Sequence, residues 1–414
     1  MHYHYWEKLP QDKIKETVFQ ALRDNVNYKE ENVLGIPATY LDEKVFSQDE
    51  VFLKEAPFIS ALVQNANHIG CHTLGTSEKH FKGTQEIERR LIEICAVDIL
   101  KAKPNDVDGY VASGGTEANL QAVWVYRNYF QNIKNATLDE ICILTSEDSH
   151  YSVDKASNLL VLDLYKIPVD KKTRKLSKSD LEKIVQGAKS EGKKHFIVFA
   201  NMMTTMFGSV DVISDYTDVL EANDCSYKVH LDGAYGGFYY PFIEGETDLN
   251  FGNPAISSVT LDAHKMAQAP YGTGVFLIRK GLIDNVHTKE ASYVSGEDCT
   301  LIGSRSGANA IAVWMILVKH GPYGWNEKIY LLQKRTKWLC EALSKLKVAY
   351  FRNERSNILT IDSSYINEDI ANKYGLVPDN HTTPLWYKIV IMEHVTIEKL
   401  IPLVASIRKY KRHG

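Results

Sequence analysis

The sequence lacks several patterns by which common protein classes are recognised. Its six cysteines are scattered, with no C-x-x-C pair and no spacing typical of metal ligands. No uncharged apolar run approaches the length of a membrane span, and the N-terminal residues contain no apolar stretch like that of a secretory signal. No internal repeat or low-complexity segment is present. We therefore expect a protein of the reducing cytoplasm, with no metal site and no membrane association.

The charge is nearly balanced, which bears on the partners to expect. The chain has 48 lysines and arginines against 52 aspartates and glutamates, and its formal net charge is −4. With no basic excess, we expect no nucleic-acid partner. A length of 414 residues is enough for a large domain and a smaller one. We predict an N-terminal segment over 1–75 that packs on a partner subunit, a large domain over 76–300 and a small C-terminal α+β domain over 301–414.

Three short apolar runs in the middle of the chain predict buried strands. Val229–Leu231 and Val259–Leu261 are each followed by an acidic residue and then by small residues. A third run, Gly274–Ile278, follows a turn rich in glycine and proline. Apolar runs of this length, bounded by Gly, Pro and Asp, are typical of buried strands in an α/β sheet.

Asp232 and Lys265 lie at or just beyond the ends of the first two runs. Functional groups of open α/β sheets gather at the carboxyl ends of the strands. An aspartate and a lysine at that edge suit a cofactor with one cationic nitrogen and one aldehyde, as in pyridoxal 5′-phosphate (PLP). The lysine would then form a Schiff base, and the aspartate would bind the pyridinium nitrogen. The alternative is a salt bridge between two ordinary side chains.

A glycine turn in the first half of the chain predicts an anion site. Ser113–Thr116 reads Ser-Gly-Gly-Thr, between a short predicted strand, Tyr110–Ala112, and a predicted helix, Glu117–Phe130. Free backbone N–H groups and the helix dipole attract an anion at such a helix start, and glycine allows close approach. The pattern is neither G-x-G-x-x-G nor a Walker sequence, so a nucleotide is not favoured. The alternative is an ordinary turn between a strand and a helix.

Two further polar positions follow predicted strands. His150 lies just beyond the strand Ile141–Thr145 and begins the next helix, and Thr204 follows the strand His195–Ala200. If these strand ends share an edge with the glycine turn, the imidazole of His150 is placed to lie flat against an aromatic cofactor ring. The alternative is a histidine that serves only in packing.

Predicted strands and helices alternate through the large domain, which favours a mostly parallel sheet with right-handed crossovers. The other elements expected there are helices at Ile14–Asp24, at Thr84–Ile99 with Thr84 as its cap, at Ser177–Gly187 and at Asp215–Ala222, and a strand at Leu160–Ile167. Beyond the large domain we predict helices at Ala308–Lys319, Gly324–Leu346 and Ile397–Lys409, and strands at Ile358–Ile361 and Tyr387–Met392.

Five motifs occur in one order along the chain. They are SGGTEAN at Ser113–Asn119, SHYSVDKA at Ser149–Ala156, HLDGAYGG at His230–Gly237, DAHKM at Asp262–Met266 and GSRSG at Gly303–Gly307. In this order they resemble the group II PLP-dependent amino-acid decarboxylases, over roughly residues 80–320. The chain resembles above all the compact microbial tyrosine/aspartate and histidine decarboxylases, and sphingosine-phosphate lyases share several of the motifs.

The resemblance implies a fold and an activity. The fold is that of the PLP-dependent transferases, aspartate aminotransferase-like and of fold type I. It has an α/β large domain with a mostly parallel seven-stranded sheet, a small C-terminal α+β domain and an N-terminal segment. The activity is decarboxylation of an L-amino acid to the corresponding amine and CO2, through a Lys265 Schiff base. A homodimer with active sites at the subunit interface is also implied.

The resemblance further implies roles for individual residues. Lys265 carries the cofactor, Asp232 binds the pyridine nitrogen, His150 stacks on one face of the ring, and Ala234 lies under the other. Tyr293 matches in loop position a tyrosine that donates a proton to the substrate α-carbon, across the dimer interface. The other cofactor contacts that we expect are Gly114, Gly115, Thr116, Thr204, His264 and Ser304.

The sequence leaves the amino-acid substrate open. Met203 stands where the family often has glycine, before Thr204, and is placed to reshape the substrate pocket. Arg305 is a candidate partner for an acidic substrate, for the phosphate or for a second subunit. The remaining candidates for the pocket are Tyr40, Phe58, Thr73, Leu74, His80 and Phe81.

Two other functions are weighed against decarboxylation. One is a carbon–carbon lyase of the sphingosine-phosphate lyase type, acting on a phosphorylated amino alcohol. The other is a catalytically inactive protein of the PLP fold that serves as an interaction partner. Lys265, Asp232 and His150 are all present, which argues against the inactive form.

Overall fold

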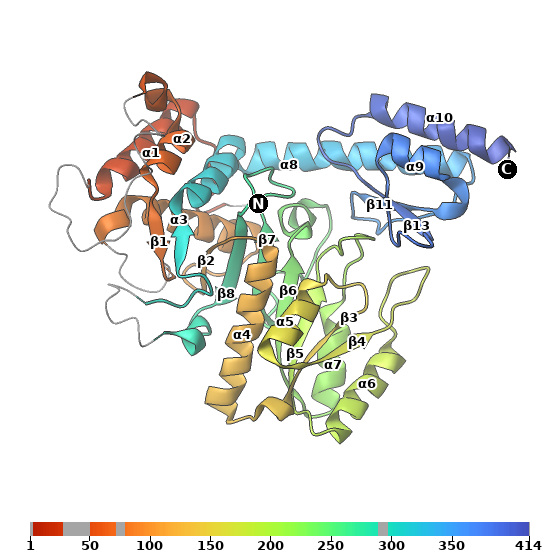
Figure 1. Cartoon of the computed structure of the whole chain (residues 1–414), viewed down its shortest axis with the longest axis horizontal. Coiled ribbons are helices and arrows are strands. Elements are labelled where there is room, and N and C mark those ends of the chain that lie inside the picture. The colour runs from red at the N-terminus through yellow and green to blue at the C-terminus, as the bar shows by residue number, and fades with distance from the viewer. Residues whose placement is uncertain (1–2, 28–49, 72–78, 289–296, 414) are drawn as a thin grey trace.

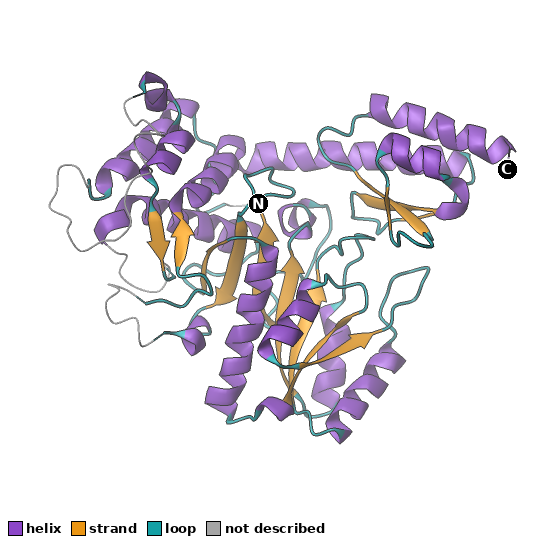
Figure 2. Cartoon of the chain, in the orientation of Figure 1, coloured by secondary structure: helices purple, strands orange, loops and turns teal. Residues whose placement is uncertain are grey.

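The computed structural model describes residues 3–27, 50–71, 79–288 and 297–413. At its centre lies a seven-stranded sheet with the strand order β2-β8-β7-β6-β5-β3-β4. Neighbours from β4 to β7 pair in parallel, and β8 is antiparallel to both β7 and β2. Figure 2 shows this sheet between its covering helices. The strands are β2 (Val107–Ala112), β3 (Ile141–Ser146), β4 (Asp163–Ile167), β5 (His195–Asn201), β6 (Ser226–Gly233), β7 (Ile256–Asp262) and β8 (Gly274–Arg279). The mostly parallel seven-stranded sheet that we predicted is confirmed.

Helices cover both faces of this sheet because its strands are apolar on both sides. Ile141 and Ile143 of β3 belong to the core under α4 and α5. Their neighbours Cys142 and Leu144 belong to the opposite core, with α6 and α7. These helices are α4 (Gly115–Lys134), α5 (Ser152–Leu160), α6 (Lys178–Ser190) and α7 (Ile213–Ala222). A strand buried on both faces is a continuous apolar run in the sequence, which is why these strands were predictable.

The described part of the N-terminal segment packs on its own chain. Trp6 is buried, and its Nε1 donates a hydrogen bond to the carbonyl oxygen of Leu317 at 2.7 Å. Ile14 and Val18 lie in the same core as the inner face of the sheet. The helices here are α1 (Gln11–Asp24), α2 (Pro57–Gln64) and α3 (Lys82–Glu93), the last continued by a π-helical turn over Ile94–Ile99. Packing of this segment on a partner subunit stays a prediction.

One long helix, α8 (Gly307–Lys345), connects the large sheet to a smaller one (Figure 1). It bends at Gly321, whose φ of +63° interrupts the helix, and the two helices predicted here are its halves. Its second half packs on a four-stranded sheet with the order β10-β11-β13-β12. The remaining elements are β1 (Asn67–Ile69) paired with β9 (Ser304–Ser306), then β10 (Tyr350–Phe351), β11 (Ile358–Asp362), α9 (Glu368–Tyr374), β12 (Val377–Pro378), β13 (Trp386–Val390) and α10 (Ile397–His413). The domain boundaries that we expected stay a prediction.

Two local predictions are wrong. The predicted strand Leu160–Ile167 begins only at Asp163, because α5 continues to the first residue of that range. Thr84 is not the cap of its helix but a buried residue within α3. The amides of Gly83 and Thr84 donate instead to the side-chain oxygen of Asn25, at 3.0 and 3.2 Å. A cap supplied by a residue so far away in the sequence has no local signal.

The cysteines are small core residues. All six are buried and none is in a disulfide. Within the described part of the chain, no helix combines the length and the apolar character needed to cross a membrane.

Helices α1 and α3 approach closely at Gly83. A Cβ on this residue would lie 2.0 Å from the carbonyl oxygen of Ala21, a backbone atom of α1 that cannot move alone. We expect Gly83→Ala to lower the free energy of unfolding by roughly 1–3 kcal/mol in urea denaturation, as overpacking does. The control is Gly187→Ala in α6, where a Cβ meets nothing within 4 Å. It should raise stability by about 0.5–1 kcal/mol. Equal effects of the two changes would contradict this packing.

Candidate active site

A pocket of about 600 Å³ lies at the carboxyl ends of the parallel strands. The ends of β2 and β6, the turn after β7, and the chain leading into α4 and α5 form its wall. The predicted site residues on this wall are Gly114, Gly115, Thr116, His150, Asp232, Ala234, His264 and Lys265. The wall is completed by Ser113, Glu117, Asn119, Leu120, Tyr151, Asp262, Tyr271, Gly272, Leu301 and Ile302.

The glycine turn makes an open helix start on one side of the pocket. Gly114 has a φ of +142°, which residues with a side chain rarely adopt, and α4 begins at the next residue with no side-chain cap. Glu117 fixes the turn, since its carboxylate accepts hydrogen bonds from the Ser113 amide and from the Tyr110 hydroxyl. The first N–H groups of α4 and the positive end of its dipole are therefore available to an anion.

Lys265 lies in the turn after β7, beside a buried carboxylate. Its Nζ is 2.9 Å from Oδ2 of Asp262, and Nε2 of His264 is 3.6 Å from the same oxygen. A Cβ on Gly115 would come within 2.8 Å of this oxygen. The lysine, the histidine and the start of α4 thus converge on one carboxylate, and they do so only because residue 115 is a glycine.

Asp232 lies near the end of β6 and lines the same pocket as the start of α4. The residue is 7% exposed. Its Oδ2 accepts a hydrogen bond from Nδ2 of Asn119 at 2.9 Å, and its Oδ1 accepts one from the Ala234 amide at 2.9 Å. The two donors fix the orientation of the carboxylate, as expected of a group that must face a cationic partner.

His150 follows β3 and is held by the start of α5. Its Nδ1 accepts a hydrogen bond from the Ser152 amide at 3.2 Å and lies 3.0 Å from the Ser152 hydroxyl. Because Nδ1 accepts, the neutral ring carries its proton on Nε2. Burial lowers the pKa of His150, an effect that the nearby Asp232 carboxylate opposes. At neutral pH the ring is therefore uncharged, with a fixed tautomer.

Two described residues of the predicted site are not brought to this wall. The Thr204 side chain is buried, its hydroxyl lies 2.7 Å from that of Ser209, and the residue does not line the pocket. Ser304 lies in β9, with its hydroxyl 3.3 Å from Nδ2 of Asn67. A cofactor contact by either residue stays a prediction without support from this geometry. Tyr293 lies outside the described residues.

Arg305 is a structural residue rather than a pocket arginine. Its guanidinium is buried, forms an ion pair with Glu88 at 2.5 Å and donates to the carbonyl oxygen of Gly70. Met203 is likewise buried in the core and absent from the wall, so it does not shape the pocket directly. Its φ of +71° is the kind of conformation that favours glycine, the residue common at this position in the family that the chain resembles.

The other pocket candidates that the structure describes are also placed elsewhere. Phe58 packs on the main core, Phe81 is buried at the start of α3, and neither they nor His80 line the pocket. Tyr40, Thr73 and Leu74 lie outside the described residues.

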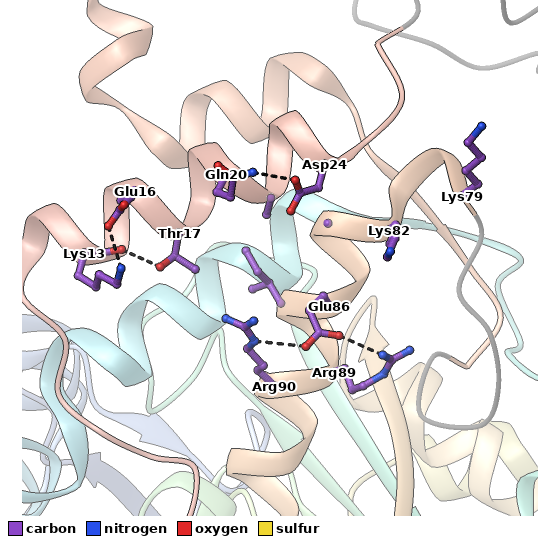
Figure 3. A pocket seen from close by; sticks show the side chains of 13 residues that line it. Lys13, Glu16, Thr17, Gln20, Asp24, Lys79, Lys82, Glu86, Arg89 and Arg90 are labelled. Carbon is purple, nitrogen blue, oxygen red and sulfur yellow. Dashed lines mark hydrogen bonds and ion pairs between the residues drawn. The ribbon is translucent and has the colours of Figure 1, made fainter. Parts of the chain in front are cut away.

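A larger cavity, of about 980 Å³, lies between α1 and α3 and does not mark the active site (Figure 3). Its wall is strongly charged, and several of the charges neutralise one another. Lys13 pairs with Glu16 at 2.9 Å, and Arg89 pairs with Glu86 at 3.0 Å. None of the predicted site residues that the structure describes lines this cavity.

The residues at the sheet edge fit PLP. Within the described residues, His264 Nδ1 and Asp262 Oδ1 are buried atoms without a hydrogen-bond partner. Buried polar groups of this kind are costly unless a ligand satisfies them. The uncapped start of α4 suits a phosphate, the carboxylate of Asp232 suits a protonated ring nitrogen, and the amine of Lys265 suits an aldehyde. The same pocket thus offers a partner to each reactive part of the cofactor.

Comparison with known proteins gives the same result. Residues 72–355 match the family model described as the pyridoxal-dependent decarboxylase conserved domain, and the chain belongs to this family. It is a PLP-dependent carboxy-lyase that acts on an amino acid. The chain is 49% identical over 409 residues to a tryptophan decarboxylase of Clostridium sporogenes, covering 99% of this chain and 98% of that protein. It is 28% identical over 328 residues to a histidine decarboxylase of Vibrio anguillarum, covering 78% and 79% of the two chains.

Solved structures confirm the fold. An L-methionine decarboxylase of Streptomyces sp. 590 superposes with a TM-score of 0.71 and 18% identity, covering 96% of this chain and 93% of the other. A sphingosine-1-phosphate lyase of Burkholderia pseudomallei superposes with a TM-score of 0.71 and 16% identity, covering 100% and 93%. At such low identity these likenesses show the fold alone, and the family match decides the activity.

Several wall residues were missed, although some had a signal. Asn119 lies four residues after Gly115, and this spacing places two side chains on the same face of a helix. His230 does not line the pocket, but it is separated from Asp232 by one residue in a strand, so the two share a face of the sheet. Leu301 and Ile302 had no signal, because their place on the wall depends on contacts with a distant helix.

His230 makes the stability of the protein depend on pH. Its side chain is fully buried, and burial lowers its pKa from 6.5 to about 4, against the effect of Asp232. Between these two pH values the unfolded chain binds a proton that the folded protein does not, so stability present at pH 7 is lost as the pH falls. We expect this residue to contribute up to roughly 3 kcal/mol to that loss. Urea denaturation from pH 7 to pH 4.5 should give a smaller loss in His230→Gln, and equal pH slopes would contradict the assignment.

Proposed function

We propose that the substrate is an aromatic L-amino acid, with L-tryptophan the preferred one and tryptamine the product. The observation that carries this proposal is the 49% identity to a protein named tryptophan decarboxylase, over nearly the full length of both chains. The other relative described above, named histidine decarboxylase, is much more distant, at 28% identity.

The composition of the pocket supports an apolar, planar substrate. Leu120, Tyr151, Tyr271, Leu301 and Ile302 supply apolar and aromatic surface. The described wall contains no arginine. Arg305, the candidate partner for an acidic substrate, is buried elsewhere in an ion pair with Glu88. An acidic side chain would have to leave water without a matching cation, which is costly.

We also propose how the chain holds PLP. Lys265 binds it covalently, Asp232 accepts a hydrogen bond from its ring nitrogen, and His150 and Ala234 lie on the two sides of its ring. The phosphate contacts come from the start of α4, through Gly114, Gly115 and Thr116, and from His264. The support for these roles is that all eight residues line one pocket and match the motifs of the family.

The reaction follows from this arrangement. PLP supplies an electron sink for the pair left behind when CO2 departs. The anion of Asp232 favours a protonated ring nitrogen, which strengthens that sink. Apolar residues of the wall, Leu301 and Ile302, limit the access of water, so that protonation of the α-carbon is left to a positioned acid. Tyr293 is the acid that the family resemblance proposes.

We propose further that the enzyme works in the cytoplasm as a homodimer. The support is the family resemblance and the exposed apolar rim of the pocket, where Tyr271 is 90%, Leu301 42% and Ile302 40% exposed. Light scattering after size-exclusion chromatography should give twice the mass of the chain. A monomer at micromolar concentration would contradict this assembly.

The substrate is tested by incubating the PLP-loaded enzyme with tryptophan, phenylalanine, tyrosine, histidine and aspartate while recording CO2 and amine. We expect kcat/KM for tryptophan to exceed that for aspartate by at least about thirtyfold, because about 2 kcal/mol or more separates a matched from an unmatched charge. Lys265→Ala should abolish release, and Lys280→Ala, at an exposed lysine, should not. Fastest release from histidine or aspartate would overturn the assignment.

A further inference from the structure

A chain of hydrogen bonds runs from Asp232 into the core between the sheet and α4. Nδ2 of Asn119 lies 2.9 Å from Asp232 Oδ2, and Oδ1 of Asn119 lies 3.0 Å from His230 Nε2. His230 Nδ1 is 2.6 Å from the hydroxyl oxygen of Ser258, which also bonds the hydroxyl of Tyr126. All five side chains are buried. None but Asp232 and Asn119 reaches the pocket wall.

The chemistry of the carboxylate determines the direction of every bond in this chain. An ionised carboxylate only accepts, so Asn119 must turn its amide nitrogen to Asp232 and its oxygen to His230. The amide oxygen also only accepts, so His230 carries its proton on Nε2. Its Nδ1 must then accept from the Ser258 hydroxyl, which leaves the oxygen of Ser258 to accept from Tyr126. All four bonds donate toward Asp232.

The second N–H of Asn119 extends the network to the other side of the ring site. It donates to the hydroxyl oxygen of Ser152 at 2.9 Å. That hydroxyl lies 3.0 Å from Nδ1 of His150, a nitrogen that already accepts from the Ser152 amide, so the hydroxyl donates to it. One amide group therefore orients both Asp232 and, through Ser152, His150.

We propose that Asn119 and His230 are positioning residues, which aim the charge of Asp232 at the cofactor ring nitrogen and fix the tautomer of His150. The inference rests on the proposed role of Asp232. Hydrogen bonds that point the same way polarise one another in a low-dielectric interior, so the chain concentrates negative potential at the pocket end. His230 must be neutral to serve in it, since an imidazolium would donate from both nitrogens and turn the Ser258 hydroxyl around.

The surroundings of His230 favour the neutral form. The ring lies between Phe199 of β5 and Phe276 of β8, with centroid distances of 4.7 and 6.4 Å. Asp232 on its own strand and Tyr126 on α4, beyond Ser258, are the titratable groups of the described chain that face it. Burial dominates over Asp232 and lowers the pKa of His230 to about 4, so the ring is uncharged over the pH range of a cytoplasmic enzyme.

The direction of the chain can be measured in the protein without cofactor. Nitrogen-15 NMR of histidine-labelled apoenzyme reports which ring nitrogen carries the proton, and His230→Gln assigns the signal by its loss. We expect His230 as the neutral Nε2–H tautomer from pH 5.5 to 8.5. The Nδ1–H tautomer, or a charged ring in this range, would overturn the proposal whether or not the substrate is correct.

The effect of His230 on the cofactor is measured with a matched pair of variants. His230→Gln keeps a donor to Asn119, whereas His230→Leu removes it. We expect His230→Leu to lower kcat about tenfold, the size typical of one lost hydrogen bond, with KM nearly unchanged. In His230→Leu, the protonated-ring form of bound PLP, followed by its visible band, should be lost at a lower pH than in the unchanged enzyme. In His230→Gln, both kcat and the pH dependence of the PLP band should stay close to those of the unchanged enzyme.

A control separates positioning from packing. His195 lies at the opposite end of the neighbouring strand β5, with its ring stacked on Phe130. His195→Leu should leave the pH dependence of the PLP band unchanged. Identical behaviour of His230→Gln and His230→Leu, in kinetics and in the band, would show that His230 only fills space. A protein that binds PLP and shows the expected tautomer but releases no CO2 from aromatic amino acids would refute the substrate alone.

Discussion

The buried carboxylate of Asp232 is the constraint on which the interior behind the pocket depends. A carboxylate away from water must accept hydrogen bonds from neighbouring donor groups. The other polar atom of each donor group must in turn be paired with a hydrogen-bond partner of the right kind. This requirement fixes the rotamer of Asn119 and the tautomer of His230. It reaches as far as the hydroxyl of Tyr126, where the chain of bonds begins. A single charge at the cofactor thus organises a line of side chains across the core.

Helix α4 carries three separate parts of the site. Its uncapped start meets the anion end of the pocket, and Asn119, one turn later, holds Asp232. Gln121 then accepts a hydrogen bond from the Leu301 amide at 2.7 Å and donates one to the carbonyl oxygen of Cys299 at 2.8 Å. These last two bonds hold the segment Cys299–Leu301 at the rim of the pocket. Helix α4 alone therefore sets the spacing between the phosphate end of the pocket, the end that holds the cofactor ring and the pocket mouth.

The sequence predicted most of the sheet well because its strands other than β4 are largely buried on both faces and contain continuous apolar runs. It predicted the core of the site because strands of a parallel sheet end at one edge, which brings Asp232, Lys265 and His150 together without further information. Contacts between segments far apart in the chain could not be predicted from the sequence. The capping of α3 by Asn25 and the pairing of Arg305 with Glu88 are specified by tertiary packing, and no local pattern announces them.

The central claim is that the pocket at this edge holds PLP through Lys265. Borohydride reduction of the PLP-loaded enzyme, followed by digestion and mass spectrometry, makes the attachment permanent and locates it. The account predicts one modified peptide, which contains Lys265 beside His264. Attachment to any other lysine, or a PLP-saturated enzyme with no modified lysine, would contradict it.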